Sequence, residues 1–138
     1  MDKIIKRKIE GSENKELTPD SIASVLMKAK VEFHYFHIQT RGFAQHNALD
    51  TLYSEITDMA DDIIECLLGR LGLRLGSLKL DPIGNYSDSE VKTCVSELHD
   101  FADKLFDYGT KNNYQDIANL AAELQQLLNK TRYRLTLS

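Results

Sequence analysis

Cysteine, proline and long apolar runs are scarce in this sequence, and each scarcity excludes a class of protein. Among 138 residues there are two prolines and two cysteines, Cys66 and Cys94, whose spacing suggests neither a disulfide framework nor a zinc knuckle. No apolar run approaches the roughly 18 residues of a membrane span. The N-terminus also lacks the apolar segment of a secretory signal. We therefore expect a protein of the cytoplasm with no membrane partner.

The length and charge of the chain bound its organisation. The length suits one domain, and the net charge of −4 argues against nucleic-acid binding by the body of the protein. That charge fits a carboxylate-rich surface that attracts cations. We predict a flexible arm over residues 1–17, either a DNA-binding tail or a solvated terminus, and one domain over residues 18–138. The arm gathers four basic residues: Lys3, Lys6, Arg7 and Lys8.

Four stretches carry apolar residues at helical spacing. The first begins with a hydroxyl N-cap and proline at Thr18-Pro19 and runs to about residue 40. The second covers about residues 44–68, and Gly69 marks its end. The third follows a serine-x-x-glutamate capping pattern at 87–90 and closes at Gly109. The fourth starts near Tyr114. Short joins within the first and last pairs predict an all-α four-helix bundle.

A long connection separates the second predicted helix (B) from the third (C). Residues 70–86 are rich in glycine and leucine. Their alternating leucines could mark a strand, but one isolated strand would have no sheet to join. We expect an ordered crossover that carries a short helical piece, and we expect its leucines to contact another subunit. A crossover of this length is the connectivity of ferritin-like bundles.

Histidines and carboxylates border the apolar stripe of the second predicted helix. On the first helix, His37 extends the apolar stripe and faces the second helix, whereas His34 points away, beside Lys30. If the two helices pack antiparallel, imidazoles and carboxylates from both can meet. Such ligands, without a thiolate, suit iron, manganese or zinc rather than a closed structural zinc site. The polar strip on the second helix comprises His46, Asp50, Thr57, Asp61 and Glu65.

The segment from His37 to Glu65 resembles the iron-binding signature of the miniferritins, the DNA-protection-during-starvation (Dps) family. Its matching parts are His-x-x-x-Asp at 46–50 and Asp-x-x-x-Glu at 61–65. The aspartates of the two motifs, Asp50 and Asp61, are eleven residues apart. The interval from His37 to His46 is three residues shorter than in that family. His34 restores the interval but misplaces the glycine bend, so either histidine can be the first ligand, and the apolar stripe favours His37. The segment is similar, more narrowly, to short ferritin-like proteins of tailed bacteriophages.

The resemblance implies a ferritin-like bundle with an iron site shared between two subunits. His37, His46 and Asp50 would come from one chain, and Asp61 and Glu65 from its two-fold mate. It implies a homo-oligomeric shell, often of twelve subunits, in which a ferroxidase reaction oxidises Fe(II) with peroxide or oxygen and stores the product. It also implies DNA contact through the basic arm in members that bind DNA. The location would be the host cytoplasm for a phage-encoded member.

A second reading of the same residues involves no catalysis. A bundle can keep the motif and act as a structural oligomer, or as one that binds a partner or DNA, for instance in a phage, because fold alone does not establish function. The shortened join between the first two helices favours this alternative. A metal-free protein that stays assembled and never gains iron would favour this second reading.

Overall fold

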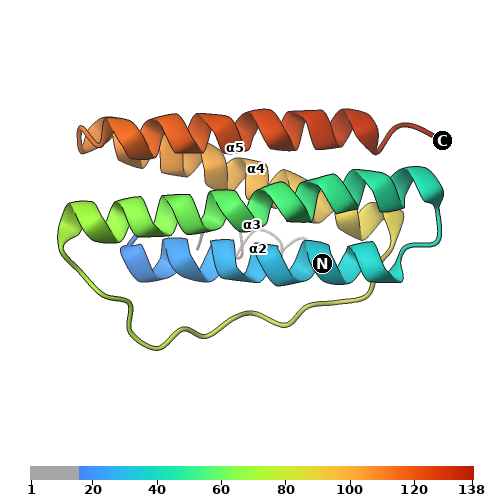
Figure 1. Ribbon diagram of the computed structural model, residues 1–138, viewed down its shortest axis with the longest axis horizontal. Coiled ribbons are helices and arrows are strands. Elements are labelled where there is room, and N and C mark those ends of the chain that lie inside the picture. The colour runs from blue at the N-terminus through green and yellow to red at the C-terminus, as the bar shows by residue number, and fades with distance from the viewer. Residues whose placement is uncertain (1–15) are drawn as a thin grey trace, which may run out of the picture.

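Four long helices make up most of the described chain, residues 16–138 of the computed structural model (Figure 1). Within that part there is no strand. α2 packs on α3, α4 packs on α5, and α3 also packs on α5, while the contact between α2 and α4 is slight. The predicted all-α four-helix architecture is confirmed. The helices are α2 (Pro19–Gln39), α3 (Phe43–Leu71), α4 (Asp88–Lys111) and α5 (Gln115–Arg134).

The N-terminal arm falls almost wholly outside the described residues. The structure begins its description at residue 16, so the predicted basic cluster of Lys3, Lys6, Arg7 and Lys8 lies outside it. The arm and its DNA contact therefore stay predictions. Within residues 16–138, no helix combines the length and the apolar character needed to cross a membrane.

The starts of α2 and α4 follow their sequence signals. The Thr18 hydroxyl accepts a hydrogen bond from the Ser21 backbone N–H, and the Ser21 hydroxyl oxygen accepts one from the Thr18 N–H. This reciprocal pair satisfies N–H groups that the first helical turn leaves without partners. The Ser87 hydroxyl accepts the Glu90 N–H in the same way. Both predicted helix starts are confirmed.

Two helix ends predicted from glycines are wrong. α3 continues through Gly69 and ends at Leu71, where it is capped by Gly72, whose φ of 65° lies in the left-handed region that glycine adopts without strain. α4 continues through Gly109 by two further residues. A Cβ atom on Gly109 would lie 2.7 Å from the backbone nitrogen of Ala118. Gly109 is thus required by the close approach of α4 to α5 and not by a helix end.

The crossover between α3 and α4 also differs from the prediction. Residues 73–87 form neither a helix nor a strand, and the segment spans the length of the bundle (Figure 1). Its glycines and one proline oppose the short helical piece that we expected. Leu73 is 51% exposed and Leu80 is 40% exposed. A contact of these leucines with another subunit stays a prediction.

The end of the crossover is attached to the end of α2. The Tyr86 N–H donates to Gln39 Oε1 over 2.8 Å, and the Gln39 side-chain amide donates to Asn85 Oδ1. The Tyr86 ring packs edge-on against Phe36, with ring centroids 6.3 Å apart, a usual spacing for an aromatic pair. These contacts fix the start of α4 beside the turn that joins α2 to α3.

Candidate metal centre

Two of the predicted ligands meet where α2 turns into α3. The rings of His37 and His46 are stacked, with centroids 3.9 Å apart and planes inclined by 27°. His37 lies in the last turn of α2 and His46 in the first turn of α3, and only residues 40–42 separate the two helices. The antiparallel pairing expected from the apolar stripes is what brings these rings together.

Hydrogen bonds fix the tautomer of each neutral imidazole. His37 Nδ1 lies 3.2 Å from the backbone oxygen of His46, and His46 Nδ1 lies 3.0 Å from the backbone oxygen of His37. A carbonyl oxygen can only accept, so each Nδ1 must donate. The lone pair of each neutral ring is therefore on Nε2. Hydrogen bonds of this kind from Nδ1 orient histidines that bind metals through Nε2.

Asp50 places a carboxylate near one of the two imidazoles, that of His37. Its Oδ1 lies 3.9 Å from His37 Nε2, and its side chain is 57% exposed, compared with 15% for His37. This distance is too long for a hydrogen bond. A carboxylate oxygen and a nitrogen lone pair repel each other unless a cation lies between them, either a proton on Nε2 or a metal ion. The donor set therefore suits a divalent cation that prefers nitrogen and oxygen ligands.

The second histidine considered as a first ligand has a different environment. His34 is exposed, and its ring stacks on Tyr53 with centroids 4.3 Å apart. The Tyr53 ring also lies 5.1 Å from that of His37. His37 therefore contacts His46, while His34 stacks on the ring of Tyr53 on α3.

Asp61 and Glu65 are remote from the histidine pair of their own chain. Eleven residues separate Asp50 from Asp61 on α3, which is about 16 Å along the helix axis. Asp61 Oδ1 accepts a hydrogen bond from Lys30 Nζ over 2.9 Å, and Glu65 is exposed. One chain does not bring all five predicted ligands together. A site with all five needs a second chain.

A metal-like cluster on α4 was not predicted. In the described part of the chain, His99, Asp100 and Asp103 offer ligand atoms that all lie within 4.8 Å of one another. His99 and Asp103 lie one helical turn apart and Asp100 follows His99 directly, but exposed acids lie close together in this way on many helices without a metal. Asp103 already accepts a hydrogen bond from Gln125 over 2.7 Å. This cluster contains none of the residues of the predicted site.

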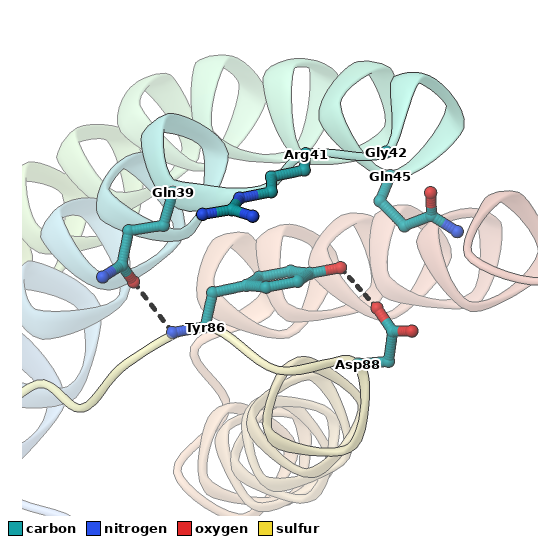
Figure 2. Close-up of a pocket in the computed structure, with 6 residues that line it drawn as sticks. All are labelled: Gln39, Arg41, Gly42, Gln45, Tyr86 and Asp88. Atoms are coloured by element: carbon teal, nitrogen blue, oxygen red, sulfur yellow. Dashed lines mark hydrogen bonds between the residues drawn. The ribbon is translucent and has the colours of Figure 1, made fainter.

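A polar cavity of about 480 Å³ lies at the same end of the bundle (Figure 2). The Tyr86 hydroxyl donates to Asp88 across its wall. Burial, followed by this carboxylate, raises the pKa of Tyr86. The predicted ligands do not line the cavity, so it is separate from the candidate metal centre. Its lining residues are Gln39, Arg41, Gly42, Gln45, Tyr86 and Asp88.

Both cysteines are free and neither belongs to the candidate centre. Cys94 is buried, and its Sγ lies 3.5 Å from Glu90 Oε1. Burial, reinforced by the carboxylates of Glu32 and Glu90, raises the pKa of the Cys94 thiol well above its ordinary value. A thiol held protonated is a poor metal ligand. The centre therefore relies on imidazole and carboxylate donors.

Comparison with known proteins places most of the described chain in one family. A family model matches residues 37–135, from the first histidine of the pair almost to the end of α5. The chain belongs to DUF5856, a family of unknown function. The DUF5856 match covers α3, α4, α5 and the crossover, so these elements carry the family pattern. The match gives no Dps or ferritin-like family.

A curated relative comes from a bacteriophage. The chain is 38% identical over 53 residues to the "Uncharacterized 14.6 kDa protein in mobD-ri intergenic region" of Enterobacteria phage T4. The matched stretch covers 38% of this DUF5856 chain and 41% of the phage protein. The chain thus spans about two fifths of the length of that relative. No solved structure matches the chain significantly.

Proposed function

We propose that this protein binds Fe(II) at a site shared between two copies of the chain and oxidises it as a ferroxidase. His37, His46 and Asp50 of one copy and Asp61 and Glu65 of the other provide the ligands. The observation that carries this proposal is the reciprocal pair of Nδ1 hydrogen bonds between His37 and His46. It leaves the lone pair of each neutral ring on Nε2, and the Nε2 of His37 lies 3.9 Å from Asp50 Oδ1.

The chemistry follows from the types of donor. Iron is the substrate, and hard carboxylate oxygens stabilise Fe(III) more than Fe(II), which favours oxidation. Hydrogen peroxide takes one electron from each of two ferrous ions and, with two protons, is reduced to water. Oxygen is the alternative oxidant. The product would be stored or detoxified inside a ferritin-like, Dps-like miniferritin shell built from two-fold dimers, often twelve subunits in all.

The proposed setting is the cytoplasm of a bacterial host. Its support is the similarity to a protein of phage T4. In that setting the basic arm with Lys3, Lys6, Arg7 and Lys8 is the part of the chain suited to DNA contact and protection. Such binding would weaken steeply as salt concentration rises.

The test is the rate of Fe(II) oxidation in anaerobic protein given peroxide or oxygen, followed by absorbance. The double variant Asp61→Asn with Glu65→Gln should lose the fast reaction. Asp58→Asn with Asp62→Asn is the matched control, because both of these side chains are exposed on the same helix and the charge change is equal. A wild-type rate no faster than that of the protein-free solution, or equal loss in both double variants, would contradict the proposal.

One observation favours the second candidate function, a non-catalytic oligomer that binds a partner. Val31, Tyr35 and Ile38 on α2 are 50%, 42% and 65% exposed. Their spacing places them on one face of the helix, where another protein or another subunit can cover them. Protein that assembles fully without metal and never oxidises iron would favour this function.

A further inference from the structure

The carboxylate half of the candidate centre already holds a positive charge. Lys30 Nζ donates to Asp61 Oδ1 over 2.9 Å. The Lys30 side chain is 21% exposed and that of Asp61 is 55% exposed. Lys30 is therefore the more buried partner of the pair, while more than half of the Asp61 side chain is open to solvent or to a second chain.

Lys30 lies close enough to the candidate metal centre for its charge to affect cation binding there, in addition to its ion pair between α2 and α3. It precedes His37 by seven residues on α2, so the two side chains share one edge of the helix about 10 Å apart. Asp61 lies opposite Lys30 on α3. Any second chain that brings its imidazoles to Asp61 also brings them to the Lys30 ammonium.

We propose that Lys30 is the resident cation of Asp61 and competes with Fe(II) for this carboxylate. The inference rests on the proposed function and adds how its affinity is set. In the metal-free protein the ammonium neutralises Asp61. When Fe(II) binds, Asp61 exchanges a monovalent partner for a divalent one, and the flexible lysine stem carries the ammonium to solvent.

The energetics allow this exchange. An ion pair with one partner more than half exposed is screened by water and contributes little to stability, so it opens readily. A divalent ion attracts a carboxylate twice as strongly as a monovalent ion at the same distance and dielectric. The displaced ammonium still repels Fe(II) nearby. Lys30 therefore weakens iron binding without preventing it.

The test is an anaerobic titration of the full chain with Fe(II), comparing wild type with Lys30→Met. Loss of the competitor should tighten Fe(II) binding by about tenfold, which corresponds to a unit charge about 6 Å from a divalent ion in a water-like dielectric. Lys28→Met is the matched control. It removes the same charge from the same helix, but Lys28 pairs with Glu32 at 3.6 Å and not with Asp61.

A second variant keeps the inference testable if Lys30→Met does not fold. Lys30→Arg retains the charge and can hold a carboxylate through two parallel hydrogen bonds. It should therefore weaken Fe(II) binding, in the opposite direction to Lys30→Met. Far-UV circular dichroism shows which of the variants are folded.

The outcomes separate this inference from the proposed function. Wild-type protein that binds and oxidises Fe(II), with the same affinity in Lys30→Met, would overturn the competition and leave the function standing. Binding only in Lys30→Met would refute the function for the natural chain, and it would also contradict a competitor that weakens iron binding without preventing it. If neither protein binds Fe(II), both are overturned, because removing the competitor uncovers no site.

Discussion

Replacing Gly109 by alanine should destabilise the bundle, although alanine is the better helix former. The added Cβ would lie 2.7 Å from the Ala118 backbone nitrogen and 3.0 Å from its Cα. Both are backbone atoms, so α4 and α5 must move apart. Overpacking of this kind costs about 1–3 kcal/mol. The gain in helix propensity of about 1 kcal/mol offsets part of that cost, and we expect a net loss of about 1 kcal/mol.

Gly69→Ala is the matched control. Gly69 also lies inside a helix, but a Cβ atom there would meet nothing within 4 Å. The same chemical change should therefore stabilise the protein by about 0.5–1 kcal/mol. Urea unfolding of the two variants, monitored by circular dichroism, gives both free energies. Equal stability of the two variants would refute the close approach of α4 to α5.

Two further predictions follow from the displaced pKa values. Burial raises the pKa of the Cys94 thiol. In the folded protein at pH 8, a thiol reagent should therefore modify Cys66, which is partly buried, and leave Cys94 unmodified, whereas in urea it should modify both. Rapid modification of both cysteines under native conditions would contradict this. Hydrogen bonding from Arg70 lowers the pKa of Asp116, so the stabilisation from this pair is present above the ordinary carboxyl pKa and is lost as pH falls through the lowered one. Asp116→Asn should therefore be less stable than wild type in urea at pH 7 and equally stable in strong acid, whereas an undiminished difference in acid would exclude this linkage.

Local signals in the sequence determine much of the fold. Apolar spacing and the caps at Thr18 and Ser87 correctly predicted four helices, because these features act within one or two turns. The helix ends predicted at Gly69 and Gly109 were wrong. Gly109 is explained by a contact with Ala118 on the next helix, and no pattern within α4 alone contains that information.

Part of the candidate site was also predictable from the sequence, and part was not. The meeting of His37 and His46 follows from two apolar stripes and a short join, so it was predictable. The pairing of Lys30 with Asp61 was missed, because it depends on how far α2 and α3 are displaced along each other. Whether Asp61 and Glu65 complete the site is a property of two chains, and the fold of one chain does not determine it.

The most direct test of the shared site is complementation between two inactive variants. One variant carries His37→Ala with His46→Ala, and the other carries Asp61→Asn with Glu65→Gln. Refolded together in equal amounts, half of the random two-fold dimers are mixed, and each mixed dimer has one intact site of two. The account predicts recovery of about a quarter of the wild-type rate of Fe(II) oxidation. No recovery in mixtures that demonstrably contain mixed dimers would contradict a site shared between subunits.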